Sequence, residues 1–243
     1  MAEAKTANDP EPLVVRPSDV IISPFGKCGT TWLQQMVHTL RTRGDMDHTD
    51  ISAVVPWIER SHNLGIDLNA HQRAEPRAFK SHLPYDKVPK GGRYIVSLRA
   101  PEDAAVSLFR FTEGWFFEPN TIDINEFTQK DYLGRPSERD YWHHLTSWWE
   151  QRDREDVLLL AYEHMVNDAA GTIRKVAAFI GVELDDALLA LTLDHTSLPF
   201  MLEHKDRFDD RLMRERSETV GGLPPNADSA KVRKGVVGES RHE

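Results

Sequence analysis

The sequence predicts an α/β fold, a three-layer sandwich in which helices cover both faces of a mostly parallel sheet. Short apolar runs of strand length alternate with longer stretches of helical periodicity. Three of the four runs are almost continuously apolar, which is typical of strands buried on both faces of a parallel sheet. Ligands of such sheets bind at the carboxyl ends of the strands, so the site is expected in the loops that follow them.

Four runs are the expected strands. They are residues 19–23 (DVIIS), 77–82 (RAFKSH), 93–99 (RYIVSLR) and 156–162 (DVLLLAY). The first, third and fourth are the continuously apolar ones, which suits strands that are buried on both faces of a parallel sheet.

Helical patterns fill the intervals between these runs. Residues 30–43 place their apolar side chains on one stripe and reach a stop signal at Gly44. Residues 101–113 open with a proline and two acidic residues, which suits a helix start, and stop at Gly114. Residues 168–180 predict a further helix. We expect one domain over 19–243.

Composition excludes several classes of protein. The chain has a formal net charge of −9, whereas a non-specific nucleic-acid binder is usually basic. A small anionic ligand would therefore need a local positive pocket. No run is long and apolar enough to span a membrane. The single cysteine excludes an internal disulfide framework and fits a reducing compartment, so we expect a cytoplasmic protein.

Two charged or polar segments carry no motif of their own. Residues 1–18 begin with the polar stretch MAEAKTANDPEP and are expected to form a flexible leader. Residues 203–222 are densely charged, and we interpret them as a solvated helix or loop.

The loop after the first expected strand has the layout of a phosphate-binding loop. It opens a helix, so free backbone N–H groups and the positive end of the helix dipole point at its ligand. Gly26 and Gly29 let the backbone come close to that ligand, Thr30 and Thr31 add hydroxyls, and Lys27 adds a cation. A fold like that of the P-loop NTPases follows.

The loop departs from the Walker A pattern, in which lysine directly follows the second glycine. Here Lys27 comes two residues before Gly29, which weakens the prediction of an ordinary nucleotide triphosphatase. Cys28 could be a nucleophile at a helix start. A cysteine phosphatase would need an arginine at the position of Gln34, so a packing role for Cys28 is favoured.

Several short motifs resemble those of the cytosolic-type sulfotransferases, in the same order and at the expected spacing. Each is weak alone, and together they cover the chain from about residue 19 onward. They are KCGTTW (27–32), FKSHLP (79–84), SLRAPEDAAVS (97–107), WWEQ (148–151), LLLAYEHM (158–165), HTSLPFM (195–201) and VRKGVVG (232–238).

The resemblance implies a donor, 3′-phosphoadenosine 5′-phosphosulfate (PAPS), with 3′-phosphoadenosine 5′-phosphate (PAP) as product. The phosphate loop would hold the phosphosulfate, Trp32 and Tyr162 the adenine, and Arg99 with Ser107 the 3′-phosphate, which a basic loop would cover. The implied donor residues are Lys27, Cys28, Gly29, Thr30, Thr31, Trp32, Arg99, Ser107, Tyr162, Thr196, Ser197, Leu198, Arg233, Lys234 and Gly235.

Lys80 and His82 lie two residues apart on an expected strand, so both can face one site. The resemblance makes His82 the general base for the acceptor hydroxyl, with Lys80 and Lys27 as the cations that stabilise transferred charge. Sulfonate transfer needs position and charge more than covalent help, and no metal is implied.

The acceptor side is carried by aromatic residues. Trp57 lies in a segment that resembles the family's acceptor wall, and Trp115, Phe116 and Phe117 follow one another in sequence. With His82 they would bind a small apolar or aromatic hydroxyl compound. Some of these rings could instead belong to the core.

Three departures from the family pattern concern the donor. Gly26 stands where proline is expected, Cys28 replaces serine, and Leu198 replaces a phenylalanine, with Phe200 nearby as an alternative aromatic residue. The chain also ends soon after residue 238, before the family's usual last segment, so the C-terminal end is interpreted as truncated and the oligomeric state stays open.

Two other functions remain. A P-loop phosphotransferase would need magnesium ligands and a triphosphate site, for which the lysine is misplaced. A non-catalytic PAPS- or PAP-binding protein would keep Trp32 and Arg99 and would not need His82.

Overall fold

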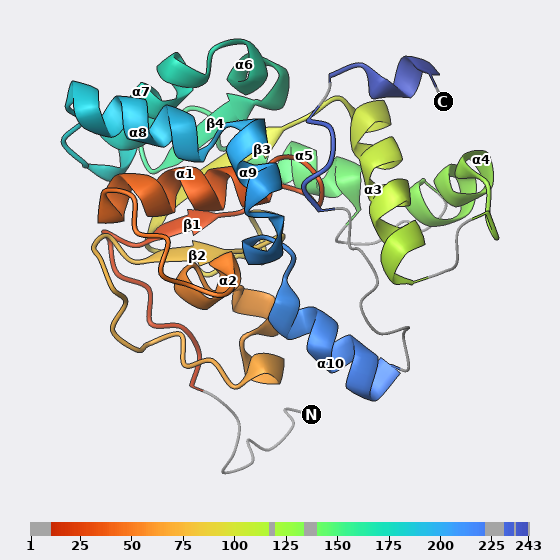
Figure 1. Ribbon diagram of the computed structural model, residues 1–243, viewed down its shortest axis with the longest axis horizontal. Coiled ribbons are helices and arrows are strands. Elements are labelled where there is room, and N and C mark those ends of the chain that lie inside the picture. The colour runs from red at the N-terminus through yellow and green to blue at the C-terminus, as the bar shows by residue number, and fades with distance from the viewer. Residues whose placement is uncertain (1–10, 117–119, 134–139, 222–230, 236, 243) are drawn as a thin grey trace.

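The computed structural model describes residues 11–116, 120–133, 140–221, 231–235 and 237–242. Its centre is a parallel sheet of four strands in the order β2-β1-β3-β4 (Figure 1). The strands are β1 (Val20–Ile22), β2 (Ala78–Lys80), β3 (Arg93–Leu98) and β4 (Val157–Ala161). The predicted α/β fold around a parallel sheet is confirmed, and all four strands lie within the predicted runs.

The strand register aligns the carboxyl ends on one edge. Ile22 at the end of β1 pairs with Lys80 on β2 and with Ile95 on β3, and Leu98 pairs with Ala161 on β4. Because all strands run the same way, the loops that follow β1, β2, β3 and β4 emerge together. The order, with β1 inside the sheet, places its loop between those of β2 and β3.

Helices and short helical turns connect the strands and cover the sheet (Figure 1). The helices are α1 (Thr30–Thr42), α2 (Ile51–Val54), α3 (Pro101–Trp115), α4 (Ile124–Phe127), α5 (Tyr141–Trp149), α6 (Tyr162–Asn167), α7 (Ala169–Ile180), α8 (Asp186–His195), α9 (Leu198–Glu203) and α10 (Arg211–Gly221). The short turns are η1 (Ile58–Arg60), η2 (His62–Leu64), η3 (Thr128–Tyr132), η4 (Lys205–Arg207) and η5 (Glu239–His242).

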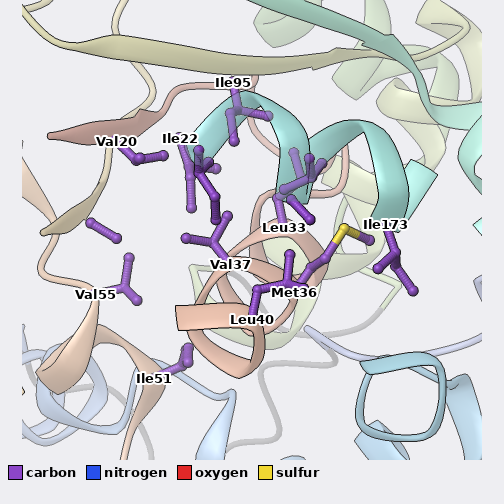
Figure 2. Close-up of a cluster of buried hydrophobic side chains, with 14 of the residues drawn as sticks. Val20, Ile22, Leu33, Met36, Val37, Leu40, Ile51, Val55, Ile95 and Ile173 are labelled. Carbon is purple, nitrogen blue, oxygen red and sulfur yellow. The ribbon is translucent and has the colours of Figure 1, made fainter. Parts of the chain in front are cut away.

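The two faces of the sheet carry different cores. Val20 and Ile22 point to one face, where they meet α1, α7 and α8. Ile21 points to the other face, where Trp148 of α5 is fully buried. Figure 2 shows the first core, with the stripe of α1 packed beneath β1 and β3. The predicted stripe is confirmed, since Leu33, Met36, Val37 and Leu40 are all buried.

Local sequence explains where the main helices begin and end. After α1 the chain leaves the helix through Arg43 and Gly44, both with positive φ. Pro101 occupies the first turn of α3, which continues to Trp115, one residue past the predicted stop at Gly114. Asp168 caps α7 through the amide of Gly171.

Residues 11–18, expected to belong to a flexible leader, lie against the body of the protein. Leu13 and Val15 pack on the core that contains Ile21. The amide of Val14 donates to Asn69 Oδ1 at 2.8 Å, and the Val14 carbonyl accepts from Arg77. The polar start of the segment did not indicate these contacts, which are made by the apolar residues Leu13 and Val15. Across the described ranges, no helix has the length and apolar character that crossing a membrane requires.

Candidate active site

A cavity of about 860 Å³ opens at the carboxyl edge of the sheet. Its walls come from the loops after β1, β2 and β3, from α3, from the starts of α6 and α9, and from the segment 231–235. The predicted donor residues lie in its wall with the exception of Cys28. Lys27, Lys80 and His82 line the same cavity, as does Trp57.

The loop after β1 is shaped by Gly29. Its φ of 95° is a conformation that L side chains rarely adopt, and an added Cβ would lie 3.0 Å from the Tyr162 ring. Gly29 caps α1 without a side-chain hydrogen bond, so the first-turn amides of the helix are left for a ligand. Thr30 Oγ1 is buried and has no hydrogen-bond partner in the described part of the chain. These groups fit a phosphate.

Lys27 is the cation of this loop. Its Nζ donates to the carbonyl of Lys231 at 3.3 Å and lies 4.5 Å from the centroid of the Phe111 ring. Burial lowers the pKa of Lys27 to about 7, with further lowering from Lys231 and Arg99, against which Asp210 raises it. A bound anion would restore the charge.

Arg99 follows β3 and points back at the loop. Its side chain is largely buried, Nη1 donates to the Lys27 carbonyl at 3.0 Å, and its guanidinium lies 4.5 Å from the centroid of the Tyr162 ring. Ser107, on α3, lines the cavity too. A fork of donors and a hydroxyl therefore line the same cavity as His82.

The thiol of Cys28 points away from the cavity. It packs with Ala104, Ala105 and Phe109, and it is almost fully buried. Burial raises the pKa of Cys28 to about 12. A thiol of this kind is a packing residue, as expected, and only the backbone of Cys28 can approach a donor.

His82 is held in one tautomer. Its Nδ1 lies 2.8 Å from the carbonyl oxygen of Pro24, which can only accept, so Nδ1 carries the proton and Nε2 keeps a lone pair. Its backbone amide donates to Glu59 at 2.7 Å. Burial, and then Lys80, lower the pKa of His82 to about 3. The imidazole is therefore neutral and able to accept a proton.

Lys80 ends β2 beside His82. It is 1% exposed, and its Nζ lies 3.0 Å from Asp210 Oδ2 and 3.9 Å from the centroid of the Trp57 ring. Trp57 is brought there by a parallel bridge to Lys80. Burial lowers the pKa of Lys80 to about 8, and Asp210 opposes that shift.

Asp210 and Lys231 are charged residues of the cavity wall that the sequence did not reveal, and Glu59 and Arg60 are two more. Asp210 lies in the region 203–222, which was interpreted as solvated, and that interpretation is wrong for its middle. Phe208 and Asp210 are buried, and α10 begins directly after them. No local signal separates Asp210 from its charged neighbours, because its partners Ser52, Lys80 and Lys231 come from distant segments.

Part of the cavity wall is apolar, and it contains the expected Trp57 beside residues that the sequence did not indicate. Phe25, Leu83, Leu108 and Phe111 line the cavity together with Trp57. Phe116, which follows the last residue of α3, is 63% exposed and does not line the cavity. The side chain of Trp115, and Phe117 as a whole, lie outside the described part of the structure.

Leu198 lines the cavity, and Phe200 does not replace it there. The Phe200 ring stacks on His195, with centroids 4.4 Å apart. Leu198 instead reaches Gly235, where an added Cβ would lie 3.5 Å from its Cδ2. The adenine wall expected at this point would be aliphatic.

Comparisons with known proteins agree with this geometry. A family model described as "Sulfotransferase domain" matches residues 17–243. Sulfotransferase 2A1 of Rattus norvegicus is 30% identical over 234 residues, which cover 93% of this chain and 78% of that protein. Sulfotransferase 1C2 of Rattus norvegicus is 28% identical, covering 92% of this chain and 77% of that protein.

Solved structures share the fold. Retinol dehydratase in complex with androsterone and inactive cofactor PAP superposes with a TM-score of 0.74 at 20% identity, covering 94% of this chain and 76% of that one. Mouse sulfotransferase SULT7A1 complexed with PAP gives 0.67 at 23% identity, covering 92% and 78%. The match of the family model over nearly the whole chain, joined to the 30% identical relative, shows that this protein belongs to the sulfotransferase domain family.

Proposed function

We propose that the protein transfers a sulfonate group from PAPS to a hydroxyl of a small apolar or aromatic acceptor. The observation that carries the proposal is the fixed tautomer of His82, which leaves a lone pair on Nε2 of a residue that lines the same cavity as Lys80 and the phosphate-type loop. A protein that only bound the nucleotide would not need this buried base.

The residues present fit the donor. The unpartnered Thr30 hydroxyl, the first-turn amides of α1 and Lys27 would hold its 5′-phosphosulfate end. Arg99 and Ser107, with the basic segment at Arg233 and Lys234, would hold the 3′-phosphate. Trp32, Tyr162, Thr196, Ser197 and Leu198 would surround the adenine, and the two aromatic rings already meet edge to face at 5.9 Å.

When bound, the donor supplies a sulfonate already joined to a phosphate leaving group. His82 would accept the proton of the acceptor hydroxyl at Nε2, while Nδ1–H stays on the Pro24 carbonyl. An anionic donor beside the ring favours the charged imidazole, so the pKa of His82 would rise from its low value as the site fills. Lys80 and Lys27 would balance the charge around the transferred group.

The acceptor class rests on the apolar wall near His82. Phe25, Leu83 and Phe111, with Trp57, offer rings and aliphatic surface, and they suit a flat apolar alcohol or phenol. Relatives are named in agreement with this class. One is the 3-beta-hydroxysteroid sulfotransferase of Cavia porcellus, and a solved retinol dehydratase holds retinol and PAP.

The test is label transfer. The protein is incubated with sulfur-labelled PAPS and a panel of phenols, steroid alcohols, other lipid alcohols and amines. We expect label on an apolar hydroxyl. Tight donor binding with no label on any acceptor would instead favour a non-catalytic PAPS-binding protein, and phosphate transfer from labelled ATP would favour a phosphotransferase.

A further inference from the structure

A buried carboxylate lies in the wall of the cavity. Its negative charge is the opposite of what a site for an anionic donor requires. Asp210 is 4% exposed and lines the cavity between η4 and α10. Its φ of 48° is a left-handed conformation, which an aspartate tolerates better than most residues. A buried charge in a strained backbone needs strong local partners.

Three segments distant in sequence supply these partners. Ser52 Oγ, from α2, donates to Asp210 Oδ1 at 2.8 Å. Lys80 Nζ, at the end of β2, lies 3.0 Å from Oδ2 and 3.2 Å from Oδ1. Lys231 Nζ, from the segment 231–235, lies 2.5 Å from Oδ2. One carboxylate therefore joins the catalytic strand to the segment that borders the donor end.

We propose that Asp210 is a positioning residue of the sulfonate-transfer site, whose carboxylate holds Lys80 charged and aimed into the cavity and fastens the segment 231–235 through Lys231. This inference rests on the proposed function, because Lys80 and the segment matter for transfer only if PAPS is the donor. Asp210 itself would not touch the reacting atoms.

Asp210 lies among several buried positive groups. The groups that face Lys80 are Lys27 from the β1 loop, His82 beyond β2, Lys231, and the more distant Asp50 at the start of α2. Without Asp210, three buried lysines would face one another with no carboxylate in contact with Lys80. Burial would raise the pKa of Asp210, but Lys231 and Lys80 hold that pKa well below its usual range. The carboxylate is thus a constant negative charge.

The segment 231–235 is bordered by contacts with two acidic side chains, Asp210 and Asp103. At its start, Lys231 pairs with Asp210, and the Lys231 carbonyl accepts from Lys27 Nζ. Beyond it, the amides of Gly238 and Ser240 donate to the Asp103 carboxylate on α3 at 2.6 and 3.0 Å. Two acidic anchors therefore fix a short span.

Arg233 and Lys234 lie between these anchors and line the cavity. Where they stand depends on the ion pair between Asp210 and Lys231, so loss of that pair would release one end of the basic span. Its grip on a 3′-phosphate would then weaken.

Another role would give the opposite result. If Asp210 merely occupied the place of the donor's anion, PAP would have to displace it, and removing its charge would tighten PAP binding at every pH. If Asp210 positions the lysines, removing its charge lets them lose protons, and PAP binding weakens as pH rises.

The test uses Asp210→Asn, which keeps the shape and removes the charge, and Asp210→Glu, which keeps the charge. Asp209→Asn is the matched control, since Asp209 is the neighbouring buried carboxylate but pairs with Arg214 at 2.8 Å and lies outside the cavity wall. PAP binding is measured by calorimetry from pH 6 to 9, in buffers of different ionisation enthalpy, so that proton uptake is counted.

For Asp210→Asn we expect near-parental PAP affinity at pH 6 and a loss of about tenfold for each unit by which the lysine pKa falls, with extra proton uptake near pH 7.5. The Asp210→Glu variant should show most of the parental pH profile of PAP binding. The Asp209→Asn control should show the parental profile unchanged. A pH profile identical to the parent's, or tighter PAP binding at every pH, would overturn the proposal.

Lys231→Met tests whether the ion pair anchors the segment 231–235, and it leaves Asp210 in place. It should narrow the preference for PAP over 5′-AMP, because the basic span loses an anchor, while the Lys80–Asp210 pair remains. An unchanged preference would refute the anchoring role even if Asp210→Asn failed to fold. A parent that binds PAP but transfers no label would refute the proposed function alone, since both readouts here are of binding.

Discussion

The ring of His82 is tied to the backbone of the phosphate loop's entry, with Nδ1 2.8 Å from the carbonyl oxygen of Pro24. The contact fixes which nitrogen bears the proton and joins the end of β2 to the loop after β1. This hydrogen bond therefore joins the His82 ring to the start of the loop after β1.

The first prediction is that His82 in the donor-free protein stays neutral across the ordinary pH range. Burial and Lys80 lower its pKa to about 3, so charging should begin only near pH 4. Its imidazole proton resonance, identified as the signal missing from His82→Ala, is followed by NMR from pH 5 to 8. A titration midpoint between pH 5.5 and 7.5 would show that the ring is solvated.

The second prediction concerns the pH dependence of donor binding in the parent protein. The pKa of Lys27 is lowered to about 7 in the free site, and a bound phosphate would raise it. Affinity for PAP should therefore be greatest below pH 7 and fall as pH rises toward the bound-state pKa. Calorimetry between pH 6 and 9 measures it, with phosphate-free adenosine as control. A flat PAP profile would mean that Lys27 does not contact the nucleotide phosphates.

The third prediction separates the two ends of the nucleotide. Arg99→Ala should weaken binding of PAP by about 1.5–3 kcal/mol, the contribution of a charged hydrogen bond, and that of 5′-AMP by less. Both ligands should lose some affinity, because Arg99 Nη1 also donates to the Lys27 carbonyl and so supports the loop after β1. Calorimetry with both ligands decides: equal losses would show that Arg99 does not read the 3′-phosphate.

The fourth prediction concerns the loop itself. Gly29→Ala places a methyl group 3.0 Å from the Tyr162 ring at a φ of 95°, so it should cost about 1–3 kcal/mol of stability and weaken PAP binding. Gly65→Ala is the control, with a φ of 66° and no atom within 4 Å of the added methyl. Thermal unfolding and calorimetry compare the two. If the two variants change PAP binding equally, the loop at Gly29 does not bind the nucleotide.

Local pattern was enough to predict the strands, the stripe of α1 and the phosphate loop. Each of these is encoded by neighbours in the chain: Val20 and Ile22 by an apolar run, Leu33 and Met36 by helical spacing. The family motifs then named residues that the structure brings to one cavity, from Lys27 to Gly235.

Contacts between distant segments were beyond the reach of local pattern. The charged region 203–222 hides Asp210, whose partners Lys80 and Lys231 lie 130 and 21 residues away along the chain. Burial of a charge is decided by such partners and not by its neighbours in sequence. The run of aromatic residues did not indicate that Phe116, just past the end of α3, would be 63% exposed and would not line the cavity.

The most direct test of the proposed mechanism pairs donor binding with turnover in His82→Ala, using His143→Ala as the control. His143 lies on α5, pairs with Asp86 at 3.0 Å and is not part of the cavity wall. Because His82 would act on the acceptor and not on the donor, His82→Ala should bind PAP as the parent does while its initial rate of label transfer falls about 100- to 10,000-fold. His143→Ala should match the parent in both. A rate for His82→Ala within about threefold of the parent's, far short of the loss of a general base, would contradict the mechanism, and so would a large loss of PAP affinity.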